Sequence, residues 1–215
     1  TTRRDPAIRP EVVVYDVDLT LTLPLGLTVT SALNAIAHAM EGFYAPDRHP
    51  VAEALSRDAM VAFRDALPAL AKDAQDKEAR AKALYAAWGC SLTLGHVTMA
   101  LHHKLAHVLG GSFGLPHAET HAVLLPHTTA YNEPAVGDLL KPIADTFGGT
   151  AGAGLWHFAK SVGAPLRLAD LGFKETDLDR AAEIATKNPY ANPRPVSRDG
   201  IRQLLQQAHD GHCPD

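Results

Sequence analysis

What is scarce in this sequence excludes several classes of protein. Its 215 residues include only two cysteines, Cys90 and Cys213, which make neither a disulfide framework nor the spacing of a zinc site. The formal net charge is -4, and no basic stripe interleaved with aromatic residues is present, so the footprint of a nucleic-acid-binding protein is missing. We therefore expect no nucleic-acid partner and a reducing, cytoplasmic location.

The sequence also lacks the long apolar run of about 18 residues that a membrane span requires. Its polar start, TTRRDPAIRP, does not resemble a signal peptide, so we expect no membrane association. Hydrophobic residues make up 46% and charged residues 20% of the chain, as in an ordinary globular protein. There is no initiator methionine, and a loop leads at once into a strand-like run, so we expect a fragment of a longer protein.

Strand-like sequence is nearly absent, because it is confined to residues 11–24. Val12 to Tyr15 form one apolar run, and Leu19 to Leu23 alternate with threonines. After Pro24 the apolar pattern becomes helical and remains so. We therefore predict a mainly α fold in which residues 1–25 are loop and strands and residues 26–215 form a helical domain.

The pattern of helical segments can be given in more detail. The first is expected to begin at a cap among Thr28, Thr30 and Ser31, and Ser197 is the expected cap of the last. We predict helices from that first cap to about 43, then at about 50–67 with a break or kink at Pro68, 76–94, 99–111, 117–133, 134–147, 153–162, 175–187 and 197–209.

Histidines are concentrated in one stretch. Seven of the twelve lie between His96 and His127, on two expected helices that meet at Gly110-Gly111 and Pro116. His103 and His107 are four residues apart and share a helix face, on which His96 is also expected one heptad earlier, whereas His102 points elsewhere. His117 and His121 repeat this spacing. Such clusters serve metal binding, proton transfer or stabilisation of a developing negative charge, so we predict a functional site.

Asn34 and His38 form a further i, i+4 pair, on an alanine-rich helix that other elements can approach closely. By itself such a pair is usually a local structural detail. Beside the histidine helices, it is expected to complete the same pocket.

Three other motif-like strings are less informative. Asp16 and Asp18 follow an apolar run as D-x-D-x-T, the arrangement of a haloacid-dehalogenase phosphatase, but no later strands are present to build its parallel sheet. The glycine-rich string at 147–154 follows a helix and lacks GxGxxG, so a loop is expected. In HAETH, Glu119 lies on the helix side away from both imidazoles, unlike the glutamate of a zinc protease.

These histidine strings identify a family resemblance. NAIAHAMEG, and HHKLAHVLGG followed by FGLPHAETHAVLLPH, resemble the C-terminal half of iron-containing (group III) alcohol dehydrogenases, and the maleylacetate reductase branch most of all. YDVDLTLTLP and NPRP are similar to that family as well. His103 to His117 spans fourteen positions, as in the family's histidine motif.

The resemblance implies roles for individual residues. Asn34, His38, His103 and His117 match the family's metal-ligand positions, and His107 matches a histidine beside the nicotinamide and the substrate. Metal-dependent members have aspartate where this sequence has Asn34, so a divalent metal is doubtful. The implied reaction is NADH- or NADPH-dependent reduction of maleylacetate, with His38, His103, His107 and His117 as catalytic residues.

The remaining implications concern partners and substrate contacts. The resemblance implies that residues 1–25 come from the junction with a missing N-terminal domain and that residues 26–215 are the helical catalytic domain. The dinucleotide is expected to bind mainly to the missing domain, and a homodimer is expected. A dicarboxylate substrate would be helped by cations at the mouth of the site, for which Lys104, Arg167 and Arg194 are the candidates beside Asn34. Three alternatives stay open: a metal-dependent alcohol dehydrogenase of the same family, a hydrolase-like metal protein that uses the histidine cluster, and an interaction module with structural histidines.

Overall fold

The fold is a bundle of eight α-helices with three short 3-10 turns in the part of the chain that the computed structural model describes, residues 10–214. The helices are α1 (Leu25–Tyr44), α2 (Pro50–Lys72), α3 (Lys77–His96), α4 (Leu101–Phe113), α5 (His117–Phe147), α6 (Ala151–Ser161), α7 (Leu178–Thr186) and α8 (Arg198–Asp210). The predicted mainly α fold is confirmed. None of the described helices is both long and apolar enough to cross a membrane.

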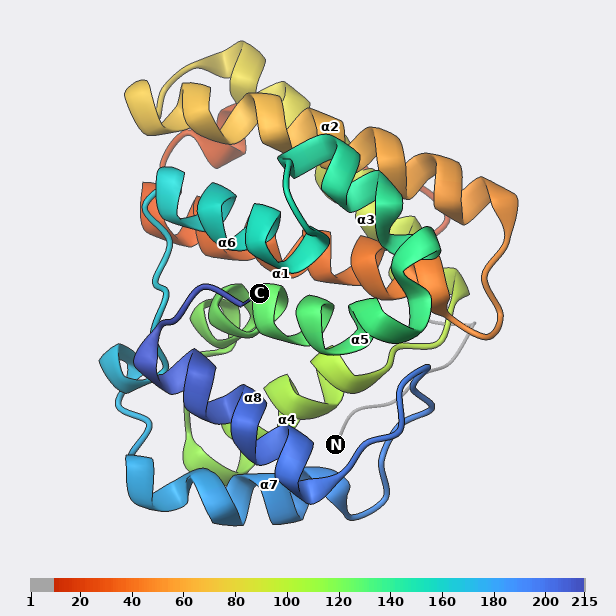
Figure 1. Ribbon diagram of the computed structural model, residues 1–215. Coiled ribbons are helices and arrows are strands. Elements are labelled where there is room, and N and C mark those ends of the chain that lie inside the picture. Colours follow the sequence, from red (N-terminus) through yellow and green to blue (C-terminus); the bar gives the residue numbers. More distant parts are fainter. Residues whose placement is uncertain (1–9, 215) are drawn as a thin grey trace.

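Helix α5 runs through the middle of the molecule and separates two groups of helices (Figure 1). Helices α1, α2, α3 and α6 lie on one side, and α4, α7 and α8 lie on the other. Helix α1 packs against α2, α3 and α5, while α5 also contacts α4, α6 and α8. The first turns of α5 therefore lie where the two groups meet.

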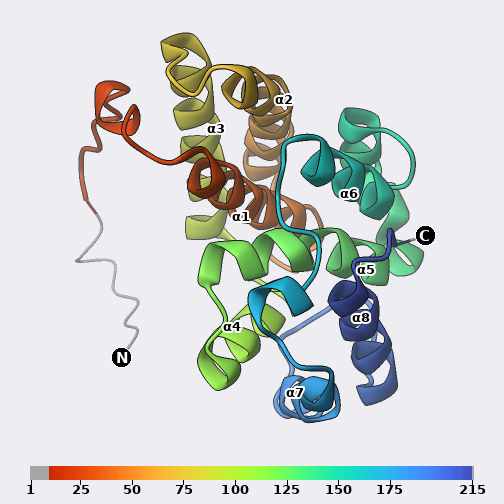
Figure 2. The ribbon, with the colours of Figure 1, turned by 90° about the vertical axis from the view of Figure 1, so that its left-hand side faces the viewer.

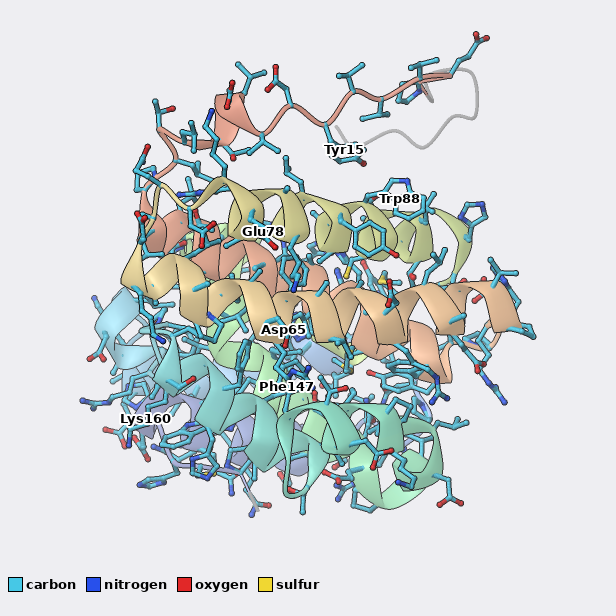
Figure 3. All side chains as sticks on the ribbon, turned by 90° about the horizontal axis from the view of Figure 1, so that it is seen from above. Tyr15, Asp65, Glu78, Trp88, Phe147 and Lys160 are labelled. Atoms are coloured by element: carbon cyan, nitrogen blue, oxygen red, sulfur yellow. The ribbon has the colours of Figure 1, made fainter. Side chains whose placement is uncertain are left out.

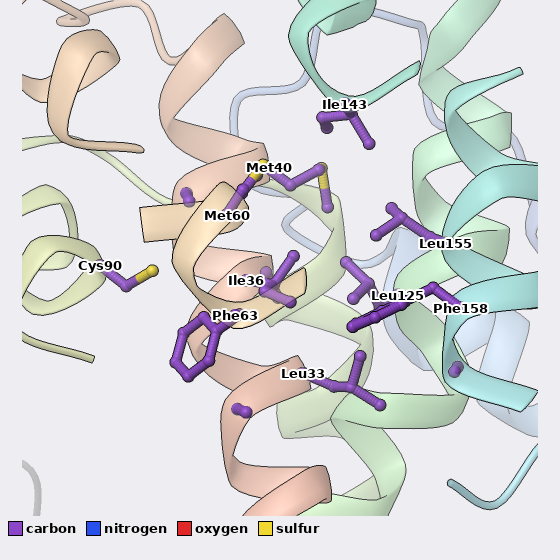
Figure 4. Close-up of a cluster of buried hydrophobic side chains, with 14 of the residues drawn as sticks. Leu33, Ile36, Met40, Met60, Phe63, Cys90, Leu125, Ile143, Leu155 and Phe158 are labelled. Atoms are coloured by element: carbon purple, nitrogen blue, oxygen red, sulfur yellow. The ribbon is translucent and has the colours of Figure 1, made fainter. Parts of the chain in front are cut away.

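Each group has its own hydrophobic core. The larger core contains Leu33, Ile36 and Met40 of α1 with side chains of α2, α3, α5 and α6 (Figure 4). The smaller core joins α4, α5, α7 and α8 around Leu105 and Leu205. Gly42 allows the close approach of α1 to α3, because a Cβ there would clash with the Thr93 Cγ2 atom.

The predicted strands at residues 11–24 are wrong for the described part of the chain, in which no strand is found. Residues 11–17 are not regular structure, and Asp18–Thr20 is a 3-10 turn. The segment runs alongside α3, where Tyr15 and Trp88 line the same shallow groove (Figure 3), and it projects from the helical body in Figure 2. Apolar alternation makes a strand only where another strand supplies hydrogen bonds, and residues 10–214 contain no such neighbour.

The start of α1 and the end of α2 differ from the expectation. Helix α1 begins at Leu25, so Thr28 and Thr30 are not caps; their hydroxyls donate to the carbonyls of Pro24 and Gly26. Helix α2 continues through Pro68 to Lys72. A proline inside a helix removes one hydrogen bond, and the packing of α2 outweighs that loss.

The histidine region also folds differently in detail. His96 ends α3, and its Nδ1 lies 2.7 Å from the Leu92 carbonyl, so it does not share a helix face with His103. Helix α4 passes through the double glycine and ends at Gly114, whose φ of 71° is the left-handed conformation that glycine favours. Helix α5 joins the two helices expected at 117–133 and 134–147, with a kink at Val136.

Candidate active site

A cavity of about 670 Å³ opens where α1, α4 and the start of α5 meet. Its lining includes all four histidines that the sequence predicted to share a pocket. The lining residues are Asn34, His38, Leu94, Val97, Thr98, Met99, His103, His107, His117, His121, Tyr190 and Ala191. The structure therefore brings the predicted residues of three helices together.

The imidazoles form a continuous series from a buried floor to an exposed rim. His103 and His121 are 5% and 1% exposed, whereas His107 and His117 are exposed. The His38 and His103 rings stack with their centroids 4.9 Å apart. The His103 centroid lies 5.1 Å from that of His121 and 6.3 Å from that of His107. A bound molecule would thus meet solvent-accessible imidazoles first and buried ones last.

Glu41 is a fully buried carboxylate behind the floor of the cavity. Its Oε2 accepts hydrogen bonds from His103 Nδ1 at 2.7 Å and from the Ala100 backbone N–H at 2.8 Å. Its Oε1 accepts one from the His102 backbone N–H at 2.7 Å. Ala100 at the start of α4 has no side chain that could cap the helix. The carboxylate of Glu41 in α1 therefore accepts the hydrogen bonds of the free N–H groups there. The same carboxylate orients the His103 ring.

His102 and Thr128 form a second buried support. His102 Nδ1 lies 2.9 Å from the Thr128 hydroxyl, and His102 Nε2 lies 2.8 Å from His121 Nδ1. His102 therefore does not reach the cavity itself, as its place on the helix indicated, but it contacts a histidine that does.

The segment between α7 and α8 forms one wall of the cavity. It carries Tyr190, whose hydroxyl lies 3.4 Å from His107 Nδ1. The ammonium of Lys104 lies 5.4 Å from the centre of the Tyr190 ring. Lys104 itself does not line the cavity, but it lies against Tyr190, which does.

Side-chain amides join this wall to helices α5 and α1. Asn192 and Asn132 exchange two hydrogen bonds, of 3.0 and 2.7 Å. Asn132 also donates to the Tyr44 hydroxyl at 3.1 Å. Burial, and then the nearby Glu41 carboxylate, raise the pKa of Tyr44 well above its usual value, so Tyr44 remains a neutral phenol.

Burial keeps His38, His102 and His121 neutral at physiological pH. It lowers the pKa of His38 to about 3 and that of His121 to about 2, with further lowering from neighbouring histidines. The pKa of His102 is lowered well below its usual value for the same reason, and that of His107 is lowered as well. Neutral imidazoles carry one N–H and one lone pair each, so the cavity combines donors and acceptors without a large charge.

Two of the expected cations do not belong to this site. Arg194 Nη1 donates to the Tyr131 carbonyl at 2.8 Å, and its guanidinium stacks on the Tyr131 ring at 4.3 Å. It lines a different pocket, between α5 and α8. Arg167 lies 3.7 Å from Asp170 in an exposed ion pair. The sequence shows that both are cationic but not which face of the fold they occupy.

The four family-type ligand positions do not fit an iron site. Asn34 supplies an amide oxygen where a carboxylate would offset the charge of a dication, and the other three side chains are imidazoles, so the set contains no anionic ligand. His103 Nε2 and Asn34 Oδ1 are buried without a hydrogen-bond partner. Within residues 10–214, no group of three or more His, Cys, Asp or Glu side chains is arranged to hold a metal ion.

Comparison with known proteins decides the family. Residues 28–209 match the model described as "Fe-containing alcohol dehydrogenase family, C-terminal". The chain belongs to this family. The resemblance of the histidine strings predicted this, and it is confirmed.

The relatives of this iron-containing alcohol dehydrogenase domain are longer proteins, of which the chain covers only a part. Maleylacetate reductase from Rhizobium sp. (strain MTP-10005) is 55% identical over the whole chain, which covers 61% of that protein. Maleylacetate reductase 1 from Cupriavidus pinatubonensis is 45% identical with the same coverage. The crystal structure of maleylacetate reductase from Agrobacterium tumefaciens superposes with a TM-score of 0.98 at 55% identity, and the chain covers 61% of it. The chain thus spans about three fifths of the length of these relatives.

Sequence reasoning missed the residues that support the histidines. Glu41 lies three residues after His38 and seven after Asn34, so helix periodicity could have predicted that it shares their helix face. His121 was recognised as part of a pair but not as a cavity residue. Thr128, Asn132 and Tyr190 gave no local signal, because only the tertiary fold brings them to the site.

Proposed function

We propose that this chain is the helical catalytic half of an NAD(P)H-dependent maleylacetate reductase, which converts maleylacetate to 3-oxoadipate in the degradation of aromatic compounds. The observation that carries the proposal is the cavity in which His38, His103, His107 and His117 meet, in a chain similar over its whole length to reductases of that name. In the complete protein, the part that this chain lacks binds the dinucleotide, and two copies form a cytoplasmic homodimer.

The reaction needs a group that stabilises a negatively charged oxygen. A hydride added to the carbon–carbon double bond conjugated with the ketone moves an electron pair onto the ketone oxygen and gives an enolate. A proton then adds to the neighbouring carbon and restores the ketone. Preorganised N–H donors in a partly buried site stabilise such an oxygen and supply the proton.

The position of each histidine suits a different part of this reaction. His107 and His117 lie at the exposed rim, where they can exchange protons with solvent; His107 also faces the expected nicotinamide. His38 and His103 lie deeper and shape the oxygen-binding end. Asn34 contacts the substrate from α1, and Lys104, which lies against Tyr190 of the cavity wall, attracts one of its carboxylates.

The donor set favours a reaction without a resident metal. Asn34 provides no negative charge to hold a dication, and an enolate spreads its charge over several atoms. N–H donors are therefore sufficient where a simple alcohol dehydrogenase requires a Lewis acid.

The test uses the full-length protein. NADH and NADPH oxidation would be measured with maleylacetate for the wild type and for His107→Asn and His117→Asn, with His157→Asn on α6 as a control outside the cavity. Loss of proton transfer is expected to lower kcat by about 10² or more in the two rim variants, while the control retains the wild-type rate. Absence of maleylacetate-dependent oxidation in the wild type, or full activity in both rim variants, would contradict the proposal.

A further inference from the structure

Tyr190 brings a hydrogen-bond donor and a positive charge to the same part of the cavity wall. Its side chain is 38% exposed, and among residues 10–214 its hydroxyl makes only a long contact of 3.4 Å, to His107 Nδ1. The Lys104 ammonium lies 5.4 Å from the centre of the Tyr190 ring and forms no ion pair with a carboxylate of the described part of the chain. The wall therefore offers an anion a free donor beside a cation that lacks a counter-ion.

No carboxylate of the described residues lines this cavity to repel such an anion. The Glu41 carboxylate behind the floor is fully buried, and three hydrogen bonds already occupy it. A carboxylate accepts short, charge-assisted hydrogen bonds, and a nearby cation stabilises it further. Because Lys104 does not line the cavity, the Tyr190 hydroxyl makes the direct contact and the ammonium acts over a longer distance. This wall therefore fits a carboxylate of a small organic acid.

A pair of side-chain amides fixes the segment that carries Tyr190. Asn192 donates from Nδ2 to Asn132 Oδ1 at 2.7 Å, and it accepts from Asn132 Nδ2 at 3.0 Å. The fully buried Asn132 uses its second N–H on the Tyr44 hydroxyl. Asn192 uses its second N–H on the Arg194 carbonyl at 2.7 Å. A buried network in which every donor is satisfied defines a single geometry, so Tyr190, two residues before Asn192, has a defined place in the wall.

We propose that the pair of Asn132 and Asn192 positions Tyr190 so that its hydroxyl binds one carboxylate of a keto dicarboxylic acid in the cavity. The two asparagines are positioning residues, because they act through Tyr190 and do not line the cavity. The class of acid rests on the proposed function. The binding is measured without turnover, so the two can fail separately.

Calorimetric titration of the full-length protein tests the contact. The probes are 3-oxoadipate and two monocarboxylates, 4-oxopentanoate and 3-oxopentanoate, each of which lacks one of its two carboxylates. Tyr190→Phe removes only the hydroxyl. Tyr85→Phe is the control, because Tyr85 is a similarly exposed tyrosine of α3 that donates to Asp58 and does not line the cavity.

In Tyr190→Phe we expect the affinity for 3-oxoadipate to fall about tenfold or more, as for the loss of one hydrogen bond to a charged group. One monocarboxylate should lose the same factor, and the other should bind as it does to the wild type. Tyr85→Phe should change none of the three affinities.

The contact would be overturned by an unchanged affinity for 3-oxoadipate in Tyr190→Phe, or by an equal fall in Tyr85→Phe. A fall for both monocarboxylates would place the hydroxyl against the ketone that they share, and a fall for neither would leave it without a carboxylate, so either result also overturns the contact. A wild type that does not bind 3-oxoadipate overturns it as well. A wild type that binds 3-oxoadipate but does not reduce maleylacetate would instead refute the proposed function, and the titrations would still decide the contact.

A double-variant cycle tests the positioning role. Asn192→Ala removes half of the amide pair at a partly buried position, and it is combined with Tyr190→Phe. If Asn192 acts through the hydroxyl, each single variant lowers the affinity for 3-oxoadipate by a similar factor, and the double variant loses no more than either. The backbone amides of residues 188–196 should also exchange faster with solvent in Asn192→Ala. Losses that multiply in the double variant, or an unchanged affinity in Asn192→Ala, would overturn the positioning role.

Discussion

Replacing Glu41 with alanine is expected to disturb both the stability of the protein and the histidine floor. The change leaves three buried donors without their acceptor: the backbone N–H groups of Ala100 and His102, and Nδ1 of His103. A buried donor left unpaired costs about 1–3 kcal/mol, and water entering the space recovers part of this. We therefore expect the free energy of unfolding to decrease by about 3–5 kcal/mol, a large fraction of the stability of a typical domain.

The Glu41→Gln variant separates the loss of hydrogen bonds from the loss of side-chain volume. Glutamine fills the same volume, but its amide must point a donor at one of the N–H groups that Glu41 now accepts, so a smaller loss of about 2 kcal/mol is expected. In both variants kcat should fall as well, because the His103 ring loses its orienting partner. The measurements are urea-induced unfolding of the full-length protein, followed by circular dichroism, and steady-state kinetics.

Glu133→Ala provides the control. Glu133 of α5 likewise accepts hydrogen bonds at the start of another helix. Its carboxylate oxygens lie 2.9 and 3.4 Å from the backbone nitrogens of Ala151 and Gly152, the first residues of α6. It is only partly buried and lies outside the cavity, so a loss of about 0.5–2 kcal/mol and unchanged kinetics are expected. Equal destabilisation by Glu41→Ala and Glu133→Ala, or an unchanged kcat for Glu41→Ala, would refute this account of the floor.

Three further predictions concern the nucleotide, the metal and pH. The 215-residue chain alone should not oxidise NADH or NADPH with maleylacetate, because hydride transfer requires the nicotinamide to be held against the substrate; measurable turnover would refute this. Dialysis of the full-length protein against a chelator should leave its activity intact, and only Asn34→Asp should gain metal affinity in calorimetry; activity lost on dialysis and restored by iron or zinc would refute this. Burial lowers the pKa of His127 to about 4 in the folded protein, whereas the pKa of histidine in the unfolded chain is about 6.5. Between these two pH values the unfolded state binds more protons than the folded state, so the free energy of unfolding decreases as the pH falls from about 6.5 to about 4. Between pH 7 and pH 5 the wild type should lose about 2 kcal/mol more than His127→Gln in urea unfolding, whereas equal losses would contradict the pKa assignment.

The fold could largely be predicted from local patterns. Asp76 and Ser197 cap α3 and α8 through backbone N–H groups of the first turn, and apolar periodicity located the other helices. The errors occurred where tertiary context overrides local preference. Val12 to Tyr15 have strand-forming side chains, but no strand lies beside them in the described part of the chain. Pro68 lies within a helix whose packing tolerates it.

The site could be predicted only as far as helix periodicity reaches. The i, i+4 pairs identified Asn34, His38, His103 and His107 as residues of common faces, and the cavity joins those faces. The contact between Asn132 and Asn192 links residues far apart in sequence and has no periodic signal. Charge alone did not predict position either, because Lys104 lies against Tyr190 of the cavity wall whereas Arg194 lines a different pocket.

The central place of α5 has a consequence for how the molecule unfolds. Neighbouring residues of this helix belong to different cores: Leu125 packs in the larger one and Leu124 in the smaller one. Opening either group of helices would expose one side of α5 to water and remove the burial that stabilises it. The two cores are thus coupled through a shared element and form one cooperative unit, in which the amide hydrogens at the centre of α5 exchange with solvent only when both cores open.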